Sequence, residues 1–138
     1  MAAGDFQSFP AGFTLDGAIE ATVLDPGGNP TDIVRKGDAW KIDVKWRLTG
    51  ALVEMICGTW QLRVVADPLG PGADVVVSRP DVALTPANGL YQDLIDMQNL
   101  LQSQATYQII VELGYTTGAN NPGTLAGLVK LGEVRVTP

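Results

Sequence analysis

The stretch that decides the fold is Trp40-Lys41-Ile42-Asp43-Val44-Lys45-Trp46-Arg47-Leu48. Large apolar residues alternate along it without a break with charged ones. Successive side chains of a β-strand point to opposite faces, whereas a helix would scatter these apolar residues around its axis. The stretch therefore predicts a strand with one face buried and the other in water.

The same alternation, or a short run of β-branched residues, recurs on both sides of this strand. The other strands that it predicts are 13–24, 60–66, 75–77, 82–84, 107–115 and 128–136. We expect a bulge near Gly132 in the last of these. Arg79-Pro80 separates two of the short strands, and because proline lacks the donor that a sheet requires, we place both near a sheet edge.

The stretch 90–101 has two interpretations. As a strand it would place Tyr91, Asp93, Ile95 and Met97 in one row, and as a helix it would gather Leu90, Leu94, Met97 and Leu101 on one face. We favour a strand over 90–97, followed by a loop over 98–106. The segment 51–58 is apolar without a clear period, which is consistent with a bent crossover or a short helix.

The composition is that of one folded domain. Hydrophobic residues make up 46% of the 138-residue chain and charged residues 17%, which is not the signature of a disordered segment. Its 16 glycines and nine prolines lie mostly between the apolar runs, as turns do. We expect one β-domain over residues 13–138, preceded by an N-terminal arm, residues 1–12, that shows neither a two-residue nor a helical period.

About seven strands at short spacing, with Trp40, Trp46 and Trp60 on inward rows, predict an all-β sandwich of two sheets. The residues around Trp40–Trp46, then Cys57-Gly58-Thr59-Trp60 and later Tyr107, resemble the strand B, C and F core of immunoglobulin-like and fibronectin type III-like modules. The resemblance spans roughly residues 13–136 and implies an immunoglobulin-like sandwich. The chain is also similar to small bacterial β-sandwich proteins. It lacks the paired cysteines of antibody domains, so the resemblance implies no antigen-binding or receptor role.

Candidate catalytic residues are scarce. The chain has no histidine, so the commonest general base and the imidazole ligand of zinc are both missing. Its one cysteine, Cys57, lies between Ile56 and Gly58, which indicates a buried and inert thiol. Asp93 and Asp96 would face opposite sides of a strand. We expect no enzyme, no metal and no cofactor, and a hydrolase with a carboxylate pair from distant parts of the chain is the least favoured hypothesis.

The charge restricts the partners. The net charge is −6 and the chain has only nine Lys and Arg residues, whereas binding to nucleic acid or anionic lipid needs clustered positive charge. The sequence opens without the basic start and apolar core of a secretory leader, and its apolar runs are short. We therefore expect no nucleic-acid or membrane partner, and a cytoplasmic protein or part of a particle assembled inside the cell.

Two groups of apolar residues suggest a protein partner. Phe6, Phe9 and Phe13 lie in or beside the arm, where leaving each ring in water would forfeit about 2 kcal/mol. Two interpretations are open: the rings cover this domain's own sandwich, or they pack on another subunit. Leu100, Leu101 and Ile110 form the second group of interaction candidates.

The function predicted from these residues is a non-enzymatic interaction or assembly module. It would bind protein, mainly copies of itself, through the arm or an open sheet edge. The alternative is a module that binds a small ligand or a carbohydrate with the loops at one end of the sandwich. The residues expected there are Asn88, Tyr115, Asn120 and Asn121.

Overall fold

Strands account for the regular structure of the described part of this protein, as the alternating sequence predicts. The computed structural model describes residues 2–7, 16–49, 58–83, 90–101, 105–117 and 122–138. The strands in these ranges are β1 (Ala2–Gln7), β2 (Asp16–Leu24), β3 (Ile33–Arg35), β4 (Lys41–Thr49), β5 (Gly58–Pro68), β6 (Val75–Ser78), β7 (Val82–Ala83), β8 (Leu90–Asp96), β9 (Thr106–Thr117) and β10 (Pro122–Thr137). Within these ranges no helix has the length and hydrophobicity to cross a membrane.

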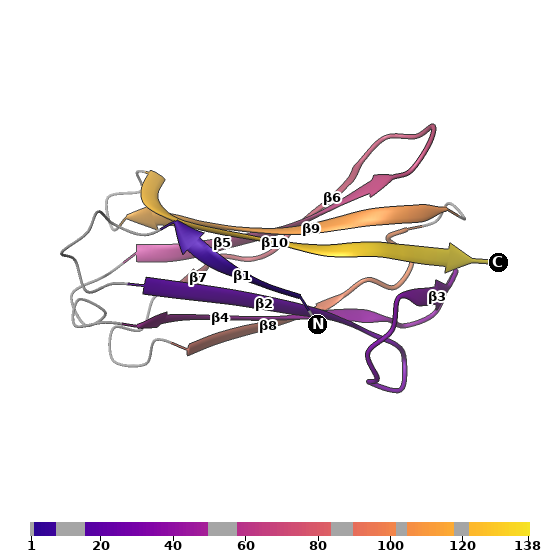
Figure 1. Cartoon of the computed structure of the whole chain (residues 1–138), viewed down its shortest axis with the longest axis horizontal. Coiled ribbons are helices and arrows are strands. Elements are labelled where there is room, and N and C mark those ends of the chain that lie inside the picture. The colour runs from indigo at the N-terminus through magenta and orange to yellow at the C-terminus, as the bar shows by residue number, and fades with distance from the viewer. Residues whose placement is uncertain (1, 8–15, 50–57, 84–89, 102–104, 118–121) are drawn as a thin grey trace.

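The strands form two sheets that lie one above the other (Figure 1). The first sheet has the antiparallel order β1-β2-β4-β8. The second has the antiparallel order β6-β5-β9-β10, with β7 beside β5 and with β3 parallel to the end of β10. The prediction of an all-β fold with two sheets is confirmed.

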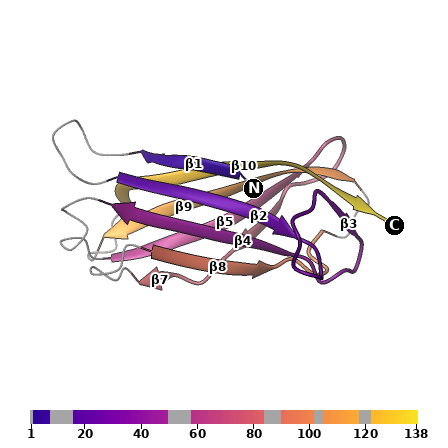
Figure 2. The same ribbon diagram turned by 60° about the horizontal axis from the view of Figure 1, so that its bottom comes forward.

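Strand β1 joins the two sheets. Residues 2–5 pair with β2, and residues 6 and 7 pair with β10. The two sheets therefore form one curled sheet that is continuous on this side (Figure 2). On the other side, between β8 and the β6–β7 segment, no strand pairing among the described residues closes it. The sequence places residues 2–7 in an arm without a regular period, whereas the structure places them in a strand. Backbone hydrogen bonds to strands on either side define β1, and such bonds need no side-chain period.

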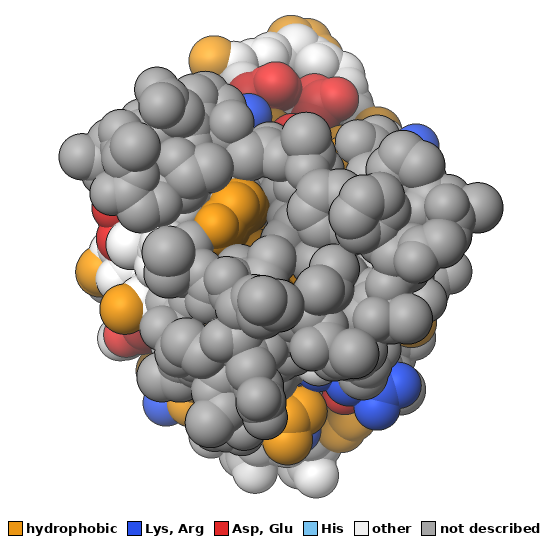
Figure 3. All heavy atoms as spheres, turned by 90° about the vertical axis from the view of Figure 1, so that its left-hand side faces the viewer, with side chains coloured by type: hydrophobic (Ala, Val, Ile, Leu, Met, Phe, Trp, Pro, Cys, Tyr) orange, Lys and Arg blue, Asp and Glu red, His pale blue; other side chains and the backbone are white. Residues whose placement is uncertain are grey.

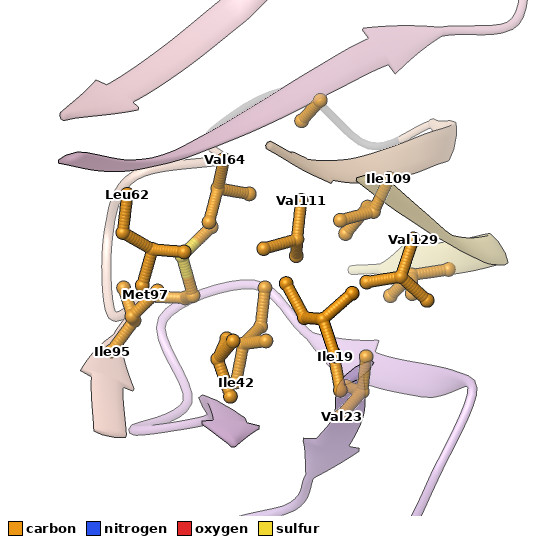
Figure 4. Close-up of a cluster of buried hydrophobic side chains, with 14 of the residues drawn as sticks. Ile19, Val23, Ile42, Leu62, Val64, Ile95, Met97, Ile109, Val111 and Val129 are labelled. Carbon is orange, nitrogen blue, oxygen red and sulfur yellow. The ribbon is translucent and has the colours of Figure 1, made fainter. Parts of the chain in front are cut away.

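The core lies between the sheets and is made of the inward rows that the sequence predicts. Residues Trp40, Ile42, Val44, Trp46 and Leu48 are all buried, as are the inward residues of β2, β5 and β9. Figure 4 shows side chains of both sheets pointing toward one another, among them Ile19 and Ile42 from the first sheet and Val64 and Val111 from the second.

Two further predictions are also confirmed. The strand predicted over 90–97 is observed as β8, whose inward row Tyr91, Asp93 and Ile95 is continued beyond the strand's end by the buried Met97. In β10 the pairing with β9 shifts between Lys130 and Gly132, where the glycine has a φ of 84°. The segment 51–58, for which a bent crossover or a short helix is predicted, lies outside the described residues, except for Gly58, which begins β5.

Candidate functional site: the open strand edges

The curled sheet ends in two strand edges that have no neighbour among the described residues. One edge is β8, which is seven residues long. The other consists of β6 and β7, which are four and two residues long and are separated by Arg79, Pro80 and Asp81. Short edge strands and a proline are devices that prevent pairing with other chains. The β8 edge lacks both, so it is the better template for an incoming strand.

The hydrogen bonds between β8 and β4 determine which backbone groups of β8 are free. The Met97 N–H donates to the Trp40 carbonyl at 3.0 Å, and these two residues continue the β4–β8 register. In an antiparallel pair the hydrogen-bonded positions alternate. The backbone N–H and C=O groups of the odd-numbered residues of β8 therefore point toward β4. The N–H and C=O groups of Leu90, Gln92 and Leu94 consequently point away from β4, toward the open edge.

The outer face of β8 is apolar at two of these positions. Leu90 is 65% exposed and Leu94 is 46% exposed. Between them, the Gln92 side-chain amide donates a hydrogen bond of 2.8 Å to Asp43 Oδ1 on β4. The β8 edge, defined as residues 90–94, thus combines two exposed leucines with backbone groups that no strand of the described residues pairs with.

An ion pair links β8 to the opposite sheet across the open side. Arg79 Nε donates to Asp93 Oδ2 at 2.8 Å, and its Nη2 donates to Asp93 Oδ1 at 3.1 Å. An arginine is charged at any physiological pH, and the hydrogen bond to Asp93 raises the pKa of the Arg79 guanidinium further. The Arg79 backbone N–H also bonds the Leu62 carbonyl of β5. Arg79 is thus bonded to β5 through its backbone and to Asp93 of β8 through its side chain. We call the side-chain pair the Arg79–Asp93 clamp, because it connects the β8 edge to the β6–β7 edge.

We expect the Arg79–Asp93 clamp to stabilise the fold measurably. The two side chains are 29% and 17% exposed, so solvent screens the pair only in part. A double-mutant cycle with Arg79→Ala and Asp93→Ala should give a coupling energy of about 1 kcal/mol in urea unfolding. The Arg63–Glu112 pair is the matched control, because its side chains are 54% and 34% exposed, and its coupling should be about 0.3 kcal/mol. Equal couplings for the two pairs would refute a special role for the clamp.

Four aromatic rings pack together between the sheets, near the end where β5, β8 and β10 begin. Trp46 and Tyr91 come from the first sheet and stack at 5.6 Å with an interplanar angle of 13°. Trp60 and Tyr115 come from the second sheet, and Trp60 makes edge-to-face contacts with the other three rings at 5.6–6.4 Å. Both indoles are buried, so they fill the core and offer no stacking platform to a sugar.

This end of the sandwich is also where the alternative function is expected. Figure 3 shows hydrophobic side chains of described residues at this end. Of the residues predicted to bind a ligand, Tyr115 packs on Trp60, while Asn88, Asn120 and Asn121 lie outside the described residues.

The two larger of the open hollows among the described residues lie on the outer faces of the sheets. One, of about 720 Å³, lies over β5 and β9 and is lined in part by Arg63, Glu112 and Gly114. The other, of about 590 Å³, lies over the first sheet beside Leu90 and Lys45. Across the six described ranges, no group of three His, Cys, Asp or Glu side chains is placed to hold a metal ion.

The predicted interaction residues in the arm are placed only in part. Phe6 lies in β1, with its backbone opposite Gly127 of β10. Phe9 and Phe13 lie outside the described residues.

The second predicted group divides between surface and core. Leu100 is partly exposed, and Ile110 is half-buried on the outward row of β9. Leu101 is 3% exposed and belongs to the core, which leaves it no surface for a partner. Sequence reasoning did not select Leu90 and Leu94. Both leucines share a row of the predicted strand with Gln92 and Asp96, and no pattern in the sequence marks that row as lying beside a free sheet edge.

No family model matches the chain, and no curated protein is similar to it above the level of chance.

Proposed function

We propose that this protein is a non-enzymatic interaction or assembly module that binds protein, chiefly copies of itself, through an open sheet edge. The observation that carries the proposal is the β8 edge, where free backbone groups coincide with the exposed Leu90 and Leu94. Pairing with an added strand satisfies such groups without any special residue, and it covers part of the surface of the two leucines. Apolar residues on a free strand edge are a liability unless a partner covers them.

The fold of the module is proposed to follow the immunoglobulin-like plan. Support comes from the strand order, because β2-β4-β8 and β6-β5-β9-β10 correspond to A-B-E and C′-C-F-G in that plan. In this correspondence β1 is an added strand between A and G, and β8 is strand E without the usual neighbour D among the described residues.

Sedimentation velocity over a concentration series tests the proposed self-association. Because an edge contact buries less surface than a standard interface, we expect a reversible dimer with a dissociation constant of about 10 µM to 1 mM. The weight-average sedimentation coefficient should therefore rise between roughly 5 µM and 1 mM protein. A coefficient that stays at the monomer value throughout this range would contradict self-association.

A further inference from the structure

We infer that the proposed self-association, on which this inference rests, occurs between two β8 strands in one specific antiparallel register. The register is centred on Gln92, so that Leu90 of each chain lies opposite the partner's Leu94. The β1-β2-β4-β8 sheets of the two chains then join into one continuous sheet across a two-fold axis. A second copy of this chain is the occupant because the outward row Leu90, Gln92 and Leu94 reads the same in both directions, so two antiparallel copies pair leucine with leucine.

The alternation of free backbone groups restricts the register. Only the even-numbered residues of β8 direct their N–H and C=O groups toward the open edge, as the Met97–Trp40 hydrogen bond establishes. Two-fold pairing must bring even-numbered residues opposite even-numbered residues. Three registers satisfy this condition near the middle of the strand, with centres at Gln92, Asp93 and Leu94.

Side chains choose among the three registers. Centring on Asp93 would place the two Asp93 carboxylates directly opposite each other, which is unfavourable for like charges. Centring on Leu94 would pair the two Leu94 side chains but would leave Leu90 opposite the polar Gln98. Centring on Gln92 pairs all four leucines and leaves no charge opposite a like charge. It is the register that buries the most apolar surface.

The Arg79–Asp93 clamp makes the β8 edge available for pairing. An inward-pointing charge on an edge strand normally opposes association. Here the Asp93 carboxylate is bound at both oxygens by Arg79 of the same chain, at 2.8 and 3.1 Å. In the inferred register Asp93 lies opposite the partner's Tyr91, so the joint between the two chains contains no unpaired carboxylate.

The first test is cysteine cross-linking in a Cys57→Ser background. The Cα atoms of two Gln92 residues would be about 5.5 Å apart, within reach of a disulfide, so Gln92→Cys should oxidise rapidly to a covalent dimer. The two Leu94 residues would be roughly 14 Å apart, beyond a disulfide's reach, so Leu94→Cys should cross-link at least about 10-fold more slowly. Faster cross-linking of Leu94→Cys than of Gln92→Cys would overturn the inferred register.

The second test replaces the leucines in the chain that retains its natural cysteine. Leu90→Lys/Leu94→Lys should raise the dimer dissociation constant at least about 10-fold in sedimentation. Val76→Lys is the matched control, since Val76 is 52% exposed on the other free edge, and it should change the constant less than about twofold. All these side chains are exposed, and circular dichroism confirms the fold of each variant.

The outcomes separate this inference from the proposed function. A dimer that survives Leu90→Lys/Leu94→Lys but is lost in Val76→Lys would leave self-association standing and overturn the β8 assignment. A natural chain that stays monomeric at all concentrations would overturn both.

Discussion

Replacing Trp60 by alanine is expected to lower the free energy of unfolding by about 3–5 kcal/mol, because the substitution removes the ring that joins both sheets. Trp60 is fully buried, and its ring contacts Trp46, Tyr91 and Tyr115 at centroid distances of 5.6–6.4 Å. The loss combines the transfer of a large apolar side chain with the cavity left behind. It is a large share of the roughly 5–15 kcal/mol that stabilises a typical domain.

Urea unfolding followed by far-ultraviolet circular dichroism measures this change without depending on indole fluorescence. Trp60→Phe is the control, because a smaller ring keeps part of the packing and should cost about 1–2 kcal/mol. A loss under about 1 kcal/mol for Trp60→Ala would show that the aromatic cluster does not support the core.

Replacing Gly58 by alanine is expected to cost about 3 kcal/mol or more, because the backbone at this position excludes a side chain. Gly58 has a φ of 132°, and a Cβ there would lie 2.1 Å from the Thr116 carbonyl oxygen and 2.9 Å from a ring carbon of Tyr115. The oxygen belongs to the backbone of the neighbouring strand β9, so β5 and β9 would have to move apart.

Alanine substitutions at two other glycines distinguish the cost of backbone strain at Gly58 from the cost of the steric clash. Gly132 has a φ of 84° and open space where a Cβ would lie, so Gly132→Ala tests backbone strain alone and should cost about 1 kcal/mol. Gly114 has ordinary backbone geometry and room for a Cβ, so Gly114→Ala should change stability by less than about 0.5 kcal/mol. Thermal unfolding in parallel should rank Gly58→Ala as the least stable, and a Gly58→Ala variant as stable as Gly132→Ala would contradict the close contact.

Most of the strands could be predicted because the alternation of side chains indicates which of them are buried. The row from Trp40 to Leu48 and the rows of β2, β5 and β9 are buried as expected. The favoured strand over 90–97 is β8, since the two-residue period matches the core row that ends at Met97.

The remaining features depend on contacts between distant parts of the chain. Strand β1 is defined by backbone pairing with β2 and β10, and strand β3 by backbone pairing with β10. Such pairing requires no alternation of side chains, so the sequence alone did not predict these strands. The Arg79–Asp93 clamp joins residues whose alignment across the open side follows only from the sheet order. Leu101 follows β8 into the core, although its sequence neighbourhood predicts a loop.

The β8 edge was beyond sequence reasoning for the same reason. Leu90 and Leu94 alternate with inward residues in the sequence, but only the strand order reveals that β8 has no neighbour beyond β4 among the described residues. An exposed leucine alone is unremarkable on a protein surface. An exposed leucine indicates a site for a partner only when it lies on an edge strand whose backbone groups are unpaired among the described residues.

Amide hydrogen exchange, measured residue by residue by NMR in dilute and concentrated samples, tests the pairing of β8 most directly. The amides of Tyr91 and Asp93 face β4 and should be protected at every concentration. The amides of Leu90, Gln92 and Leu94 should exchange fast in dilute solution and become protected at about 1 mM, where the β8 strands pair. Fast exchange of these three amides in a sample that sedimentation shows to be dimeric would contradict pairing through β8.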